Sequence, residues 1–261
     1  MNVTAYILTK NEETNIGNCL LALKQCGIPV IVLDSYSTDR TREIVQHCGF
    51  SVELYDYRDH LGALRYVCEG RTSCDGFCLV LDADMIVSPK VLSEAHSLLV
   101  AQGADVALAP VTMFWNGCHL KRGSLYPPKP FMFRGGSHYF EALGHGEVLL
   151  RGVRSVLTNE RLVHNDQKSF EAFLDTQVRY SKNLVRRRLG HAISWRDRLR
   201  STPLFMIGVP LFSLFVKGGI LSGKAGLGYA VDRLVAEAIM YRQCLAGTSA
   251  SENRKGTADC A

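Results

Sequence analysis

The chain has 261 residues, of which 47% are hydrophobic and 21% charged, and its formal net charge is +5 at pH 7. This length allows one large domain or one domain with an appendage, and the composition is that of a globular protein without repeats or low-complexity tracts. The nine cysteines include no Cys-x-x-Cys pair, so they indicate no zinc site and favour a reducing cytoplasm.

Two features bear on where the protein acts. Polar residues interrupt the apolar N-terminus at 10–13, so we expect no export signal there. The longest apolar stretch, 203–216, is broken by Pro210 and is shorter than the roughly 20 residues that a spanning helix needs. It predicts an interfacial or re-entrant hairpin, extending to about residue 221, or else a pair of buried helices.

Short apolar runs alternate with helical patterns along the first 110 residues. The expected strands cover 3–8, 30–33, 51–55, 77–81 and 105–110, and the expected helices cover 13–25, 38–49, 62–70 and 89–102. Such alternation indicates right-handed βαβ units, so the predicted fold class is α/β with a mostly parallel, doubly wound, Rossmann-like sheet. We expect a catalytic domain over 1–167, a helical extension over 168–247 and a disordered tail over 248–261.

The apolar run 77–81 stops at two carboxylates, Asp82 and Asp84. Residues two apart on an extended chain share a face, so both side chains point together from the carboxyl end of this strand. Ligands bind at that end of open α/β sheets. Two hard oxygen ligands there suit Mg²⁺ or Mn²⁺ with a phosphorylated substrate, and the alternative is an ordinary polar turn.

Common phosphate-binding motifs do not accompany these carboxylates. No Gly-x-Gly-x-x-Gly follows the first strand, and no Walker lysine loop occurs in the sequence. A metal on Asp82 and Asp84 can take over that task, and Arg65, on the preceding helix, can add a guanidinium to a diphosphate. Arg65 can equally be a surface residue.

Three motifs, in this order, resemble family 2 glycosyltransferases of the GT-A fold, and in particular those that build bacterial lipopolysaccharide cores and surface polysaccharides. The motifs are Ile-Leu-Thr-Lys-Asn-Glu-Glu-Thr-Asn-Ile at 7–16, Val-Leu-Asp-Ser-Tyr-Ser-Thr-Asp-Arg-Thr at 32–41 and Leu-Asp-Ala-Asp at 81–84. The resemblance covers about residues 3–185. It implies a hexosyltransferase-type enzyme that takes a sugar from a nucleotide-sugar donor.

The resemblance also implies roles for individual residues. The donor-binding set is Thr9, Asn11, Glu12, Asp34, Arg65, Asp82, Gly135 and Gly136. Within it, Thr9 and Asp34 hold the nucleobase, and Gly135 and Gly136 form a flexible loop beside the donor or, alternatively, an ordinary turn. The metal ligands are Asp82, Asp84 and His164, where His164 can instead be a core residue. Met85 departs from the family pattern, in which a glutamate often follows the two aspartates.

Inverting transfer requires a carboxylate that removes the proton from the acceptor hydroxyl. The segment His145-Gly146-Glu147 resembles the family's His-x-Glu segment and implies Glu147 as this base, with Glu141 in reserve. Either residue can also be an exposed loop carboxylate.

Basic residues between Arg179 and Arg200 precede the apolar stretch 203–216. This combination favours attachment to anionic lipid headgroups at the inner face of the plasma membrane, near a glycan or lipid-linked acceptor. No nucleic-acid motif accompanies the cluster, so no nucleic-acid partner is expected. Two other functions stay open, a sugar nucleotidyltransferase and a non-catalytic scaffold that is recruited to the membrane.

Overall fold

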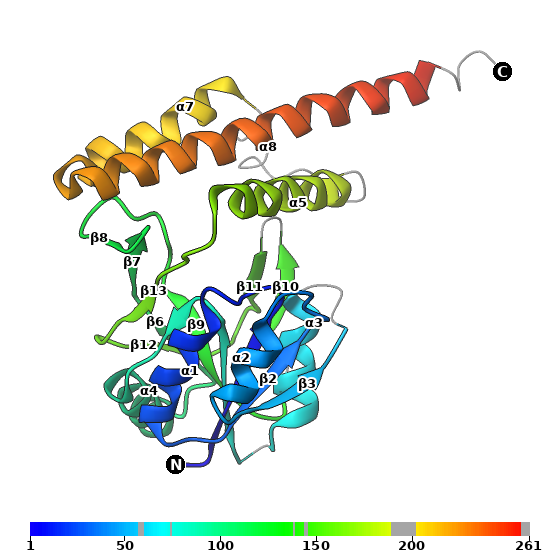
Figure 1. The fold of residues 1–261 in the computed structure, drawn as a ribbon. Coiled ribbons are helices and arrows are strands. Elements are labelled where there is room, and N and C mark those ends of the chain that lie inside the picture. The colour runs from blue at the N-terminus through cyan, green and yellow to red at the C-terminus, as the bar shows by residue number, and fades with distance from the viewer. Residues whose placement is uncertain (57–59, 74, 138, 144–145, 189–201, 257–261) are drawn as a thin grey trace. The chain divides into compact units, whose positions relative to one another are not determined.

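A computed structural model describes residues 1–56, 60–73, 75–137, 139–143, 146–188 and 202–256 (Figure 1). The chain forms two compact units. The first contains residues 1–119, 126–142 and 147–167, and the second contains 120–125, 143–146 and 168–261. The short segment 120–125 belongs to the second unit, and the predicted domain bounds 1–167, 168–247 and 248–261 stay a prediction.

A seven-stranded sheet in the order β12-β6-β9-β4-β1-β2-β3 forms the centre of the first unit. Its strands are β1 (Val3–Thr9), β2 (Val30–Asp34), β3 (Ser51–Leu54), β4 (Phe77–Asp82), β6 (Val106–Ala109), β9 (Lys129–Arg134) and β12 (Ser155–Leu157). β1 lies parallel to both β2 and β4. Ile7, Leu33, Leu79 and Leu81 are fully buried, as expected for strands that are covered on both faces.

β9 makes this sheet mixed, because it runs antiparallel between β4 and β6. Three prolines, Pro127, Pro128 and Pro130, surround its start. Proline is tolerated at a strand's first residues, where a missing N–H costs little pairing. The buried Phe131 and Phe133 then hold β9 in the core.

Helices follow the first strands as predicted, with small shifts at their starts. They are α1 (Ile16–Cys26), α2 (Thr41–His47), α3 (His60–Arg65), which continues as the π-helical turn Tyr66–Arg71, and α4 (Pro89–Gln102). The Ser88 side chain caps α4 by accepting from the Val91 N–H. α2 begins at Thr41, with Arg40 at its N-cap position and no side-chain cap.

A second, four-stranded sheet has the order β5-β13-β7-β8. Its strands are β5 (Met85–Ile86), β7 (Val111–Trp115), β8 (Cys118–Leu120) and β13 (Leu162–His164), and a separate pair joins β10 (Phe140–Leu143) with β11 (Gly146–Leu149). β13 runs antiparallel to β5, and His164 pairs with Met85. This pairing brings His164 beside the end of β4.

The second unit is helical. It contains α5 (Phe170–Arg188), α7 (Pro203–Leu211), the π turn Phe212–Val216, the 3₁₀ turn Gly219–Ser222 and α8 (Lys224–Gly256), and α7 packs along α8 (Figure 1). Within the described residues, no helix is both long and apolar enough to cross a membrane. α8 runs to Gly256, which corrects the predicted disorder from residue 248, since a long helix extends at little cost per residue. Residues 257–261 lie outside the description.

Candidate active site

The carboxyl ends of β1, β2 and β4 meet at one edge of the large sheet. In the strand register, Thr9 lies opposite Asp34, and Leu8 lies opposite Asp82. The loops that follow these three strands therefore face the same space. This edge brings together the three sequence motifs, as the parallel sheet predicts.

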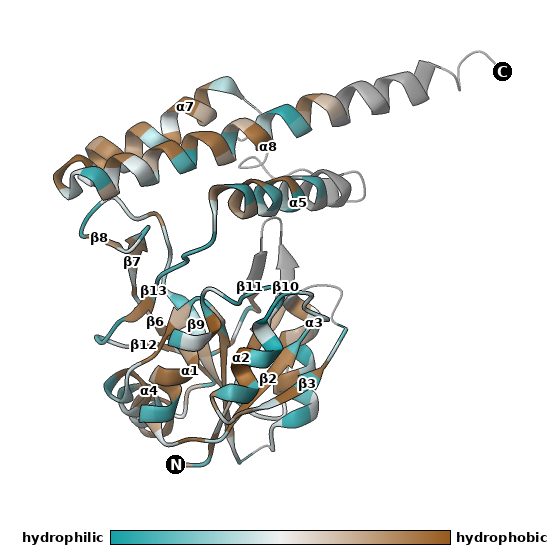
Figure 2. Ribbon diagram, in the orientation of Figure 1, coloured by the Kyte–Doolittle hydropathy of each residue, from teal (hydrophilic) through white to brown (hydrophobic). Residues whose placement is uncertain are grey.

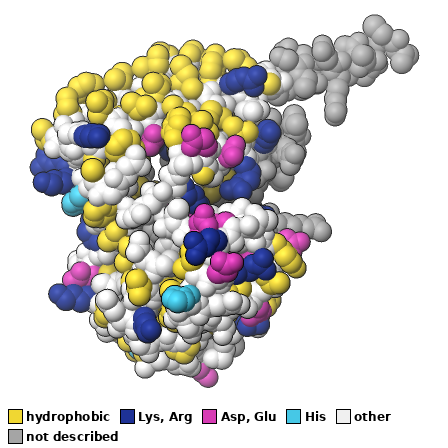
Figure 3. Space-filling model, viewed as in Figure 1, with side chains coloured by type: hydrophobic (Ala, Val, Ile, Leu, Met, Phe, Trp, Pro, Cys, Tyr) yellow, Lys and Arg dark blue, Asp and Glu magenta, His cyan; other side chains and the backbone are white. Residues whose placement is uncertain are grey.

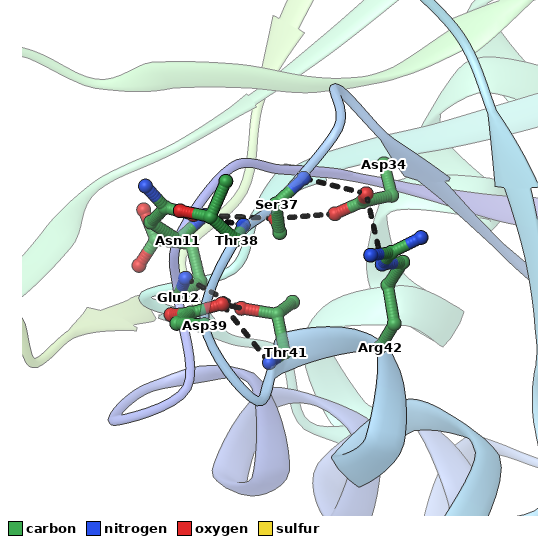
Figure 4. Close-up of polar contacts among 8 residues, drawn as sticks. All are labelled: Asn11, Glu12, Asp34, Ser37, Thr38, Asp39, Thr41 and Arg42. Atoms are coloured by element: carbon green, nitrogen blue, oxygen red, sulfur yellow. Dashed lines mark hydrogen bonds and ion pairs between the residues drawn. The ribbon is translucent and has the colours of Figure 1, made fainter.

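The loops after β1 and β2 are tied together by polar contacts (Figure 4). The backbone N–H of Asn11 donates to Ser37 Oγ at 2.9 Å, and Asn11 Oδ1 accepts from the Thr38 N–H at 2.8 Å. The Glu12 N–H donates to Thr41 Oγ1 at 2.8 Å. Asn11 and Tyr36 both have φ = 56°, a left-handed conformation that is unusual for a tyrosine. These contacts hold both loops in a strained, defined shape.

Asp34 is fully buried beneath these loops. Its Oδ1 accepts from the Ser37 N–H at 2.9 Å, and its Oδ2 accepts from Ser37 Oγ at 2.5 Å. Arg42 Nε lies 4.0 Å from Oδ1. Asp34 pairs with Thr9 in the strand register, and its carboxylate shapes the Ser37 turn. Its contact with a nucleobase stays a prediction.

Asn15 connects the β1 loop to the segment after β13, and the sequence did not single it out. Its Nδ2 donates to Glu12 Oε2 at 3.0 Å and to Asp166 Oδ1 at 2.8 Å, while its Oδ1 accepts from the Gln167 N–H at 2.9 Å. Asn15 is buried. Through Asn15, Asp166 thus helps to hold the predicted donor-binding residue Glu12 in position, although Asp166 lies 151 residues after Asn15 along the chain.

Asp84 and His164 form a close pair, and their role as joint metal ligands stays a prediction. His164 Nε2 lies 3.3 Å from Asp84 Oδ2, and the Asp84 carbonyl accepts from the Asn165 N–H at 3.1 Å. Burial lowers the pKa of His164, but the hydrogen bond and charge of Asp84, with the charge of Asp166, outweigh it and raise that pKa above its ordinary value. The centroids of the Tyr126 and His164 rings lie 5.4 Å apart.

Asp82 has a partner that the sequence did not reveal. The Lys129 ammonium forms an ion pair with Asp82 Oδ2. Burial disfavours the charged ammonium, but the carboxylates of Asp82 and Asp84 outweigh this and raise the pKa of Lys129. The sequence offers only a weak signal for this ion pair, namely a lysine among prolines at the start of an apolar strand.

These residues fit a divalent cation in part. Within the described part of the chain, Asp84 Oδ1 and His164 Nδ1 are buried without hydrogen-bond partners, whereas Asp82 is engaged by Lys129. No three His, Cys, Asp or Glu side chains among the described residues are grouped as a complete metal site. Sites that use one or two carboxylates and take further ligands from substrate phosphates match this arrangement.

Gly135 and Gly136 do not lie at this edge, which corrects the predicted loop beside the donor. They follow β9 at the amino end of β4, where the Gly135 N–H donates to the Gly76 carbonyl. A Cβ on Gly135 would lie 2.2 Å from the Ser73 carbonyl oxygen, so close backbone approach explains this glycine. Arg65 is exposed at the end of α3, and its contact with a diphosphate stays a prediction.

The predicted bases lie on the β10–β11 pair, Glu141 within β10 and Glu147 within β11. Their side chains and His145 lie outside the described residues. The assignment of Glu147, with Glu141 in reserve, is therefore still a prediction.

A family model now identifies the chain. The model described as glycosyl transferase family 2 matches residues 4–145, a little over half of the 261 residues. The chain belongs to glycosyl transferase family 2. The matched region contains the three motifs and the carboxyl ends of β1, β2 and β4, whereas β13 lies outside it. The family resemblance of those motifs is therefore confirmed.

Curated relatives within the family are distant. An uncharacterized glycosyltransferase of Rickettsia bellii (strain RML369-C) is 31% identical over 108 residues, which are 41% of this chain and 36% of that protein. The lipopolysaccharide core biosynthesis glycosyltransferase LpsC of Rhizobium meliloti (strain 1021) is 28% identical over 109 residues, which are 40% of this chain and 39% of LpsC. The match thus spans well under half of either relative.

Among solved structures, glucosyl-3-phosphoglycerate synthase from Mycobacterium tuberculosis is similar. The alignment with its complex with Mn²⁺, uridine diphosphate and glucosyl-3-phosphoglycerate covers 42% of this chain and 43% of the synthase chain. The sequence identity is 22% and the TM-score is 0.36.

Proposed function

We propose that this family member is an inverting glycosyltransferase. It moves a sugar from a nucleotide-sugar, with a UDP-sugar as the first candidate, to a glycan or lipid-linked acceptor in cell-envelope polysaccharide or lipopolysaccharide synthesis. The observation that carries the proposal is the pairing of Asp84 with His164 beside Asp82, at the sheet edge where the family's motifs meet. The similarity to LpsC supports the acceptor class.

The donor is held along the edge of the sheet. Thr9, Asn11, Glu12 and Asp34 lie on the β1 and β2 side, where the tied loops form a wall for the nucleoside, and Asp82 faces the ribose. Asp84 and His164 would hold Mg²⁺ or Mn²⁺, which when bound supplies a Lewis acid for the departing diphosphate. Arg65 can add a further positive charge.

The reaction is a single displacement at C1 of the sugar. The acceptor oxygen forms a bond to C1 as the bond from C1 to the diphosphate oxygen breaks, and the bonding pair leaves with the diphosphate. Glu147, or Glu141, accepts the acceptor's hydroxyl proton. Attack from the face opposite the leaving group inverts the configuration at C1.

The test is a panel of nucleotide-sugars with Mg²⁺ or Mn²⁺, followed by release of nucleoside diphosphate with and without glycan or lipid-linked acceptors. We expect Asp84→Asn to abolish metal-dependent donor binding, and Glu147→Gln to preserve binding but lower turnover by at least about a hundredfold. Full activity with chelator would contradict the metal role. Normal turnover of Glu147→Gln would contradict that base, and Glu141→Gln would then be measured.

We also propose that the helical unit attaches to the membrane surface, where a lipid-linked acceptor resides. The ribbon of α7 and of the adjoining part of α8 is coloured mainly as hydrophobic (Figure 2), and hydrophobic side chains gather on this face in the space-filling view (Figure 3). Leu204, Phe215, Val216 and Leu221 are each more than 60% exposed. The exposed Lys217 lies beside this patch, with its ammonium 5.8 Å from the Phe212 ring. An apolar face with cations at its border suits an anionic lipid surface.

A further inference from the structure

Lys129 is a charged residue of the site to which the proposed function assigns no role. It is the first residue of β9, which runs antiparallel to β4, so the amino end of β9 meets the carboxyl end of β4. The Lys129 side chain is 14% exposed, and that of its partner Asp82 is 34% exposed. An ammonium this deeply placed requires a compensating anion, which Asp82 provides.

The charge balance of the site indicates why a lysine lies here. Asp82, Asp84 and Lys129 together carry one net negative charge when His164 is neutral. A divalent cation turns this into one net positive charge, which can accept the diphosphate of a nucleotide-sugar. Without Lys129, the same cation would only neutralise the two aspartates, and the diphosphate would be attracted by the cation alone, without a net positive charge from this group of residues.

We infer that Lys129 is a diphosphate-binding residue of this enzyme. Its ammonium pairs with Asp82 before the donor binds, and it pairs with a phosphate oxygen once donor and cation are bound. The inference rests on the proposed function. Before the donor binds, the Lys129 ammonium and a cation compete for Asp82. In the loaded site Asp82 is released toward the cation or the ribose, and Lys129 stabilises the negative charge that the departing diphosphate gains.

This role predicts opposite effects of one substitution on two ligands. Lys129→Met removes the competitor of the cation, so Mn²⁺ alone should bind about tenfold more tightly. The same change removes a charged hydrogen bond to phosphate, so UDP in saturating Mg²⁺ should bind at least about tenfold more weakly. A merely structural lysine would change both affinities in the same direction, together with the thermal midpoint.

The experiment uses the full chain, with Mn²⁺ binding followed by electron paramagnetic resonance and UDP binding by calorimetry. Lys129→Arg keeps the charge and should retain UDP binding within a few-fold. Lys24→Met, on the exposed last turn of α1, removes an equal charge away from the site and should change neither affinity. Because Asp82 is partly exposed, water can solvate it in Lys129→Met, and thermal unfolding checks that the variant folds.

The outcomes separate this inference from the proposed function. If the wild type binds UDP and Lys129→Met binds it equally well, or if both affinities of the variant fall together, the Lys129 assignment is wrong while the enzyme assignment stands. If the wild type binds Mn²⁺ but no nucleoside diphosphate or nucleotide-sugar, the proposed function fails, and the Lys129 assignment fails with it.

Discussion

Asp39 ties the β1 and β2 loops together at the scale of single residues. Its Oδ1 accepts from the Thr41 N–H at 3.0 Å and from Thr41 Oγ1 at 2.5 Å, and its Oδ2 accepts from the Glu13 N–H at 3.1 Å. Burial alone would raise the pKa of Asp39, but these hydrogen bonds outweigh it and hold the pKa below its ordinary value.

We expect Asp39→Asn to lower the free energy of unfolding by about 1 kcal/mol at neutral pH, because a neutral amide accepts these bonds less strongly. The folded-state pKa lies below the unfolded value of about 3.9, so the ionised form's contribution is complete above that value and is lost as the pH falls. The difference between wild type and variant should therefore shrink below about pH 4.

Urea unfolding between pH 3 and pH 7 measures this difference. Glu43→Gln is the matched control, since the ion pair of Glu43 with Arg40 at the start of α2 has both side chains exposed and contributes little. A constant difference between wild type and Asp39→Asn across the whole pH range would contradict the assignment.

At the scale of elements, the helical unit depends on close backbone contact between α8 and the turn before it. A Cβ on Gly226, in α8, would lie 1.8 Å from the Gly219 carbonyl oxygen. Segment 120–125 packs into the same unit, where Ser213 Oγ donates to the Gly123 carbonyl at 2.7 Å. These glycines allow backbones to touch where side chains would separate them.

Two alanine substitutions in neighbouring helices should therefore have opposite signs. Gly226→Ala must displace backbone, and we expect it to destabilise the protein by about 1–3 kcal/mol. Gly208→Ala, in α7, places its methyl where no atom lies within 4 Å, and it should stabilise the helix by about 0.5–1 kcal/mol. Thermal unfolding of both variants measures the difference, and equal effects would show that α8 does not approach the turn in this way.

At the scale of the whole molecule, the proposed membrane attachment depends on a few exposed apolar side chains. The triple variant Leu204→Ser, Phe215→Ser, Val216→Ser should reduce cosedimentation with phosphatidylglycerol vesicles at least about tenfold, because it removes the apolar area that would enter the lipid. The double variant Leu21→Ser, Val100→Ser changes similarly exposed residues of α1 and α4 and is the control. Unchanged binding of the triple variant would contradict the proposal, as would equal binding to neutral vesicles at any salt concentration.

The sequence by itself determined the order and type of the elements around Asp82. The strands β1, β2 and β4 and the helix α4 could be predicted because apolar periodicity and helix caps are local properties of the chain. The three motifs are also short, local stretches of sequence. The family could therefore be predicted from them, and so could the edge of the sheet where Thr9, Asp34 and Asp84 meet.

Only the tertiary structure decided which distant residues complete that edge. Lys129 reaches Asp82 across 47 residues, and Asn15 reaches Asp166 across 151. The antiparallel direction of β9 brings Lys129 to the site and carries Gly135 to the other end of β4. Strand direction and register arise from the packing of the whole sheet, and no short stretch of sequence contains that information.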